Sequence, residues 1–142
     1  MIKEKPNEYI NRMVGLPWVK GADDPVRDGG LDCWGAVYHS FLCVNGVKIP
    51  TPDNRSECDF NQSMGIADYF DEVDFPLEGS VFGCYDDSGV MIHIGRVLAG
   101  RAYHAVGTPD NPGSVCTWSV RQLERQYARL GYSVKYYTYK GD

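Results

Sequence analysis

The sequence has no excess of positive charge and no Lys/Arg-rich segment. Among its 142 residues, 14 basic side chains stand against 19 acidic ones, which gives a net charge of −5. Attraction to phosphates dominates nucleic-acid binding, and an acidic chain without a basic patch offers little of it. We therefore expect no nucleic acid among its partners.

Long apolar stretches are also missing. A membrane-spanning helix needs about 20 mostly apolar residues, and a signal peptide needs an apolar core. The first 15 residues, MIKEKPNEYINRMVG, are instead charged, and no later run is long enough to cross a bilayer. We expect synthesis in a cytoplasm and no insertion into a membrane.

Paired cysteine motifs are absent as well. The cysteines are odd in number and form no C-x-x-C pair; they are Cys33, Cys43, Cys58, Cys84 and Cys116. Disulfide frameworks and zinc ribbons both depend on paired cysteines. Neither a structural metal nor a cofactor is predicted, so each thiol is judged separately.

What is present fits one ordinary globular domain over residues 1–142. The chain is 43% hydrophobic and 23% charged, which is typical of a folded domain with a single core. In the N-terminal part, apolar residues at helical spacing predict a helix over residues 6–14, ended by Gly15 and Pro17. The Gly, Pro and Asp content of residues 21–30 predicts a loop.

A central helix follows this loop. Asp32 occupies the expected N-cap position and Gly46 the C-cap region, which places Cys33 in the first helical turn. After the helix, residues 47–58 are predicted as a Pro-rich loop. Residues 62–70 are a weaker helical candidate, closed by an acidic turn.

The second half of the chain has the pattern of strands separated by Gly turns. Strands are predicted over residues 80–85, Met91–Leu98, Arg101–Val106 and 132–139, with a loop over residues 108–112 and a helix over residues 120–130. The Ala-Gly pair at residues 99–100 predicts a hairpin. Helices followed by mostly antiparallel strands indicate an α+β fold, with the helix of Cys33 packed on the sheet.

Cys33 is the thiol best placed for nucleophilic catalysis. A helix N-terminus favours the thiolate, because unpaired N–H groups and the helix dipole stabilise a negative charge. Of the three possible bases, His39 lies too far along the same helix, whereas His93 and His104 lie on the two arms of the hairpin. Taken one at a time, these residues also have structural interpretations: Cys33 and His93 as core residues, and His104 as a residue on the sheet surface.

Three segments in order resemble the NlpC-type cell-wall endopeptidases, a papain-like family. The segments are residues 31–37 (LDCWGAV) with the LPW of residues 16–18 ahead of it, residues 91–98 (MIHIGRVL), and residues 103–105 (YHA). The resemblance covers residues 9–106. It implies a papain-like α+β domain in which Cys33 is the nucleophile, His93 the base and His104 the residue that orients the base.

The same resemblance assigns three residues to substrate binding. They are Asp32 and Trp34, which flank the nucleophile, and Trp18, which stands where the family usually has a tyrosine. Asp32 also has a sufficient structural role as helix cap, worth about 1 kcal/mol. The implied reaction is hydrolysis of a peptidoglycan stem peptide at the D-γ-glutamyl-diaminopimelate bond, without a cofactor or metal.

The D-C-W-G helix start and the G-x-x-I-P of residues 46–50 resemble the bacteriophage-tail branch of this family. This branch implies a protein made in the bacterial host cytoplasm, carried at the virion tail tip among other tail-tip proteins and acting at the host cell wall. Tyr136, Tyr137 and Tyr139 are the predicted docking surface, because aromatic residues are enriched at interface cores.

Two other functions fit the same residues. One is a structural tail-tip or assembly protein with weak or no activity, which the replacement of the family tyrosine by Trp18 favours. The other is a related thiol amidase or acyltransferase that acts on a different acyl substrate. Reactivity of Cys33 toward a thiol reagent separates the enzymes from the structural protein.

Overall fold

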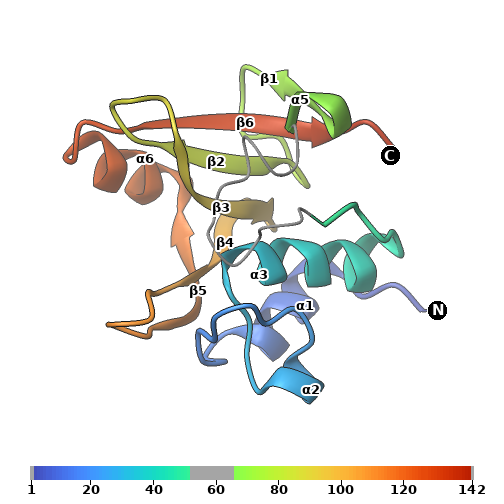
Figure 1. The fold of residues 1–142 in the computed structure, drawn as a ribbon. Helices are drawn as coiled ribbons and strands as arrows, with labels where there is room; N and C mark the ends of the chain where they lie inside the picture. Colours follow the sequence, from blue (N-terminus) through green and yellow to red (C-terminus); the bar gives the residue numbers. More distant parts are fainter. Residues whose placement is uncertain (1, 52–65, 142) are drawn as a thin grey trace.

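The computed structural model describes residues 2–51 and 66–141. Its helices are α1 (Pro6–Met13), α2 (Pro25–Asp28), α3 (Cys33–Ser40), the π-helix η1 (Phe41–Asn45), α5 (Ile66–Tyr69) and α6 (Val120–Ala128). Its strands are β1 (Phe70–Val73), β2 (Val81–Tyr85), β3 (Met91–Leu98), β4 (Arg101–Val106), β5 (Ser114–Ser119) and β6 (Ser133–Tyr139). Figure 1 shows their arrangement along the chain.

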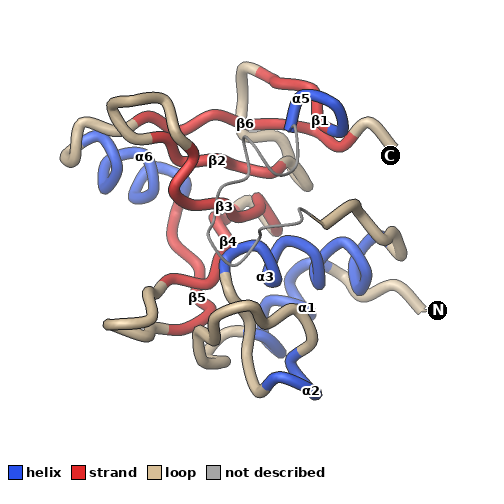
Figure 2. Tube along the Cα trace, viewed as in Figure 1, coloured by secondary structure: helices blue, strands red, loops and turns tan. Residues whose placement is uncertain are grey.

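The strands form one six-stranded sheet in the order β1-β6-β2-β3-β4-β5. Every neighbouring pair is antiparallel. Figure 2 shows the strands running through the middle of the molecule, with helices on either side. The predicted α+β class with a mostly antiparallel sheet is therefore confirmed.

The sheet buries apolar side chains on both faces. On one face, Ile94 of β3 belongs to the same core cluster as Trp34 of α3. On the other face, Phe82 of β2 and Val97 of β3 share a cluster with Leu123 of α6. Figure 1 accordingly shows α1, α2 and α3 together on one side of the sheet and α6 on the other. This layering brings the N-terminus of α3 against the middle strands.

The central helix begins and ends where the sequence predicts. The Asp32 carboxylate accepts a hydrogen bond from the Gly35 N–H at 2.7 Å, which caps the first turn. The helix continues from α3 into η1 and stops at Gly46, whose φ of 68° is the left-handed conformation that favours glycine. The first predicted helix is also confirmed, as α1.

The predicted hairpin of β3 and β4 has the expected bounds. Leu98 pairs with Arg101, and the two turn residues Ala99 and Gly100 both have positive φ, at 52° and 71°. The Glu78 carboxylate accepts hydrogen bonds from both turn N–H groups, at 2.8 and 2.9 Å. A carboxylate from outside the hairpin thus holds a turn that includes a non-glycine residue with positive φ.

Three local predictions were wrong or incomplete. The predicted loop over residues 21–30 contains α2, because the Asp24 carboxylate caps the N–H groups of Val26 and Arg27. The predicted acidic turn after residue 70 is strand β1, which pairs with β6. No element was predicted over Ser114–Ser119, which forms the edge strand β5 on β4. Of the predicted helix over residues 62–70, α5 covers residues 66–69, Phe70 begins β1, and residues 52–65 lie outside the description.

The predicted docking surface on β6 is also wrong. β6 lies between β1 and β2, and this position buries Tyr136 and Tyr137. The Tyr136 hydroxyl donates to Glu124 at 2.7 Å, and the Tyr137 hydroxyl shares a hydrogen bond with the hydroxyl of Tyr85. Tyr139 is half-buried and packs against the same core. These tyrosines stabilise the sheet and its contact with α6.

Membrane insertion through a helix is not supported by the described residues. Within residues 2–51 and 66–141, no helix combines the length and apolarity needed to cross a bilayer.

Candidate active site

Cys33 is the first residue of α3, directly after the capping Asp32. Its side chain is 4% exposed and shares a core cluster with Met91 and Ile94 of β3. The thiol therefore sits at the positive end of the helix dipole, where α3 meets β3. This position matches the one predicted from the sequence.

His93 and His104 form a hydrogen-bonded pair. The two nitrogens, Nε2 of His93 and Nδ1 of His104, lie 2.9 Å apart, and the ring centroids are 5.1 Å apart. Pairing between β3 and β4 runs only as far as Arg96 and Tyr103, so both histidines lie beyond the last pair of this ladder. Each is held from its other side, His93 opposite Cys84 of β2 and His104 opposite Cys116 of β5.

Burial keeps both imidazoles uncharged. Desolvation lowers the pKa of His93 from the ordinary 6.5 to about 4. Desolvation, and then repulsion by a charge on His93, hold the pKa of His104 well below its ordinary value. At neutral pH, the pair therefore consists of two neutral rings, which suits a general base.

The hydrogen bond constrains which nitrogen of His93 faces a substrate or a thiol. Because Nε2 is used by His104, Nδ1 is the nitrogen that remains for another partner. If Nδ1 is to accept a proton, Nε2 must carry the hydrogen and donate it to His104. His104 then carries its hydrogen on Nε2, a buried atom without a hydrogen-bond partner among the described residues. The ring of Trp118 lies perpendicular to His104 at 4.4 Å, an arrangement in which an N–H can face a π surface.

Tyr127 of α6 lies against His93. Its ring lies nearly parallel to that of His93, at 16° and 6.1 Å between centroids. Burial raises the pKa of Tyr127, and the charges of Cys84 and of a Cys33 thiolate raise this pKa further. His93 thus stacks on Tyr127, and Cys33 is close enough for a thiolate charge to act on the same tyrosine.

A hollow of about 370 Å³ opens beside His93. Its walls are Ile92 and His93 of β3, Tyr127 of α6, and residues 106–108 and 111–113 of the loop between β4 and β5. Thr108 and Asn111 offer uncharged polar groups to a ligand. The arrangement places a substrate-sized space against the proposed base.

The three predicted substrate-binding residues have different surroundings. Trp18 lies beside the hollow, because its backbone N–H donates to the carbonyl of Gly113 at 2.9 Å and its side chain packs on Gly107. Asp32 is buried and also accepts a hydrogen bond from the Gly21 N–H at 2.9 Å. Trp34 is fully buried in the core and offers no surface to a ligand in this conformation. Only Trp18 is next to a hollow that can hold substrate.

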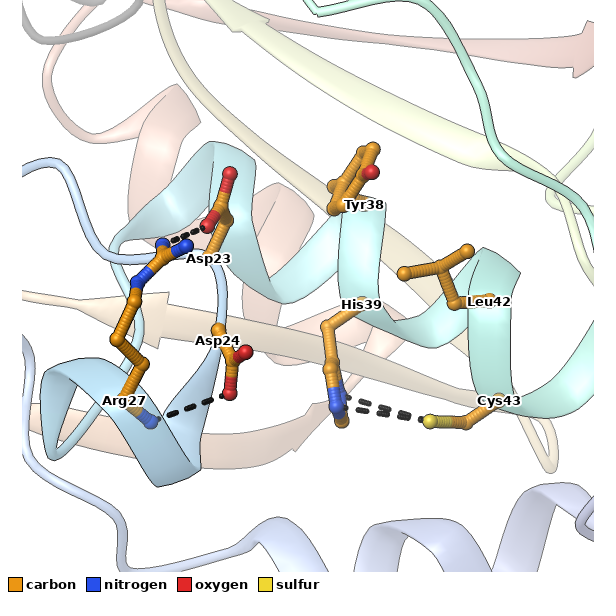
Figure 3. A pocket seen from close by; sticks show the side chains of 7 residues that line it. All are labelled: Asp23, Asp24, Arg27, Tyr38, His39, Leu42 and Cys43. Carbon is orange, nitrogen blue, oxygen red and sulfur yellow. Dashed lines mark hydrogen bonds and ion pairs between the residues drawn. The ribbon is translucent and has the colours of Figure 1, made fainter.

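A second thiol and imidazole pair lies elsewhere on the same helix. Figure 3 shows His39 and Cys43 side by side in a pocket of about 400 Å³, facing Asp23, Asp24 and Arg27. Cys43 Sγ is 3.5 Å from His39 Nε2, and the Tyr9 hydroxyl is 2.7 Å from His39 Nδ1. Desolvation raises the pKa of Cys43 and lowers that of His39, so both groups are held neutral. His39 is bonded here, away from the start of α3, as the sequence predicts.

The surroundings of Cys84 and Cys116 disfavour a thiolate. Burial raises the pKa of Cys84 and of Cys116. The four described cysteines are all thiols, and Cys58 lies outside the described residues. No three His, Cys, Asp or Glu side chains of the described part are grouped to hold a metal ion.

Two neighbours of the histidine pair were not predicted from the sequence. Tyr127 follows Leu123 by four positions on the predicted helix, a spacing that indicates a shared face but says nothing of His93. Trp118 lies in the unpredicted strand β5.

No model of a known protein family matches the chain, and no curated protein matches it.

Proposed function

We propose that this chain is a papain-like cysteine peptidase of the NlpC type that cuts peptidoglycan stem peptides. One observation carries the proposal, the hydrogen bond between His93 and His104. An imidazole whose far nitrogen is fixed by a second polar side chain is the arrangement that orients a general base toward a nucleophile. Cys33, at the N-terminus of the helix that packs on the same strand, is the nucleophile.

In the proposed reaction, Nδ1 of His93 takes the proton of the Cys33 thiol. The thiolate attacks the peptide carbonyl carbon, and the resulting tetrahedral oxyanion collapses as the C–N bond breaks and His93 protonates the leaving amine. Water, deprotonated by His93, then attacks the thioester. The products are a carboxylate and the regenerated thiol. Neutral His104 accepts the hydrogen bond of the transient His93 imidazolium throughout.

The proposed substrate bond is D-γ-glutamyl-diaminopimelate, following the family resemblance. The hollow beside His93 has the position needed for the amine side of this bond, because His93 is the group that protonates the leaving amine. Its uncharged polar groups on Thr108 and Asn111 suit hydrogen bonds to a peptide. Trp18 supports the loop that carries them.

Digestion of purified muropeptides tests the proposal. We expect the wild-type chain to release the peptide fragments expected for this bond, and Cys33→Ala to release none. Cys43→Ala is the matched control, since Cys43 lies on the same helix beside a histidine but has a raised thiol pKa; it should keep most of the activity. Turnover by Cys33→Ala would reassign the nucleophile.

A structural tail-tip or assembly protein is the second candidate function. It is favoured by the low exposure of the two central residues, 4% for Cys33 and 9% for His93. Alkylation near neutral pH, followed on the Cys33 peptide by mass spectrometry, separates the two functions. A Cys33 that reacts no faster than Cys84 would indicate the structural protein. Rapid alkylation without muropeptide cleavage would indicate a thiol amidase or acyltransferase.

The proposed place of action is the tail tip of a phage particle, with the host cell wall as target. Attachment to other tail-tip proteins would hold the domain at the wall at an effective concentration of roughly millimolar for a short flexible link. Proteomics of purified, tail-enriched particles should detect the chain, and a phage carrying Cys33→Ala should enter cells poorly. A protein missing from particles, together with normal entry of the mutant phage, would refute this location.

A further inference from the structure

The C-terminal helix α6 contributes a side chain to the surroundings of His93. Tyr127 belongs to this helix and lies outside residues 9–106, the stretch that carries the family resemblance. Its ring is stacked on His93 and forms part of the wall of the hollow. None of the roles assigned so far uses this contact.

Tyr127 is held in place from several directions. One turn earlier on α6, Leu123 is fully buried against Phe82 and Val97, which fixes the helix on the sheet. Tyr127 is also close to Cys84, the residue that pairs with His93 in the β2–β3 ladder, and the two groups affect each other's pKa. The ring of Tyr132 also contacts that of Tyr127, with 6.5 Å between the centroids and 28° between the planes. A ring fixed in this way limits how its neighbour can rotate.

We propose that Tyr127 is a positioning residue for His93: its ring packs along the imidazole and holds Nε2 on His104, which leaves Nδ1 as the nitrogen for a proton partner. The aromatic ring carries this role, because offset parallel rings attract one another and bury apolar area. The catalytic consequence rests on the proposed function, whereas the effect on His93 does not.

A histidine titration tests this inference without any substrate. The titratable groups around His93 are His104 of β4, Cys84 of β2 and Tyr127 of α6. The histidine ring signals are followed by NMR against pH, and His93 is assigned with His93→Gln. In the wild type, His93 should stay unprotonated down to about pH 5, and Tyr127→Leu should move its midpoint up by about one pH unit or more, toward 6.5. Tyr127→Phe keeps the ring and should leave the midpoint nearly unchanged.

Cys33 reports the same effect through its reactivity. At about pH 7, alkylation of the Cys33 peptide should slow by at least about tenfold in Tyr127→Leu and by less than about twofold in Tyr127→Phe. Tyr132→Leu is the matched control, since it removes a ring that contacts Tyr127 and leaves the Tyr127 ring itself on His93. It should change neither the midpoint nor the alkylation rate.

The outcomes separate this inference from the proposed function. An unchanged His93 midpoint in Tyr127→Leu, or a Tyr127→Phe variant as impaired as Tyr127→Leu, would overturn it. If Tyr127→Leu does not fold, the test is the nuclear Overhauser effect between the ring protons of Tyr127 and His93 in the wild type. The absence of this effect would overturn the inference. A failure of muropeptide cleavage alone leaves the His93 result standing and counts against the proposed function only.

Discussion

At the scale of single residues, the site depends on two buried histidines that are both neutral. A buried imidazole is stable only when it is uncharged or well hydrogen-bonded. Here one hydrogen bond joins the two rings. Phe82 and Trp118 surround His104, and Tyr127 covers His93. The apolar surroundings that depress the two pKa values also keep His93 available as a base at neutral pH.

Replacement of His104 distinguishes an orienting role from proton transfer. His104→Gln and His104→Asn retain a polar group that can bond Nε2 of His93, so both should keep measurable muropeptide cleavage. His104→Ala should lose about 10- to 100-fold more, since a missing hydrogen bond to a group that becomes charged costs about 1.5–3 kcal/mol. Initial rates of cleavage measure the difference, with His93→Gln as the inactive reference. Equal losses in all three His104 variants would argue against orientation.

At the scale of elements, the start of α3 is packed tightly against the preceding loop. A Cβ atom at Gly35 would lie 1.8 Å from the carbonyl oxygen of Ala22, so this turn of the helix and the loop are in backbone contact. Asp32 reinforces the contact, because its carboxylate accepts from the N–H groups of both Gly35 and Gly21. The glycine of the D-C-W-G motif is therefore needed to place Cys33.

Gly35→Ala should be costly for this reason. The added methyl group must displace backbone, and such overpacking costs roughly 1–3 kcal/mol or more. Gly29→Ala is the comparison, since Gly29 has a φ of 78° but no atom within 4 Å of an added Cβ; its cost should be about 1–2 kcal/mol, from the left-handed backbone alone. Urea unfolding measures both, and Cys33 alkylation should slow only in Gly35→Ala. Equal reactivity of Cys33 in the two variants would refute a role for Gly35 in placing the thiol.

A buried arginine fastens the other end of α3 to the sheet. Arg96 of β3 is 1% exposed, and its guanidinium lies 3.6 Å from the centre of the Phe41 ring. It donates hydrogen bonds to the Ser40 hydroxyl at 3.2 Å and to the Gly79 carbonyl at 3.1 Å. Because these partners belong to α3, η1 and the segment before β2, one side chain joins three parts of the chain.

At the scale of the whole molecule, the buried histidines link stability to pH. Both have native pKa values below the ordinary 6.5, so the unfolded chain takes up protons that the native chain does not as the pH falls from about 6.5 toward 4. The contribution of these histidines to stability should therefore be fully present above about pH 6.5 and be lost as the pH falls toward 4. The free energy of unfolding should fall by up to about 1.4 kcal/mol per pH unit for each histidine.

Urea unfolding at several values between about pH 7 and 5 checks this dependence, in a range where carboxylates contribute little. His104→Gln should reduce the slope of the unfolding free energy against pH by the contribution of one proton, up to about 1.4 kcal/mol per pH unit. His39→Gln should reduce it less, because His39 is only partly buried and its pKa is lowered less strongly. A slope that is the same in His104→Gln and in the wild type would contradict a neutral, buried His104.

The parts of the fold that depend on local chemistry could be predicted from the sequence. Capping by Asp32 and the left-handed Gly46 define the central helix within the segment itself, and the turn at residues 99–100 defines the hairpin of β3 and β4. Periodicity and turn chemistry act over a few residues, so their signals are readable without the rest of the molecule. The hairpin puts His93 and His104 on neighbouring strands, and their pairing with β2 and β5 beyond the end of the β3–β4 ladder sets their positions.

Long-range pairing and burial decided the rest. Strand β1 carries two acidic residues and forms because β6 offers it a partner, and β6 in turn buries Tyr136 and Tyr137 because it lies inside the sheet. The contact of Tyr127 with His93 exists only because α6 packs on the face of the sheet opposite α3. These are contacts between segments far apart in the chain, and no local pattern contains them. The sequence alone thus identifies Cys33 and the two histidines as candidates, whereas their burial, their neutral charge and their aromatic cover are properties of the folded molecule.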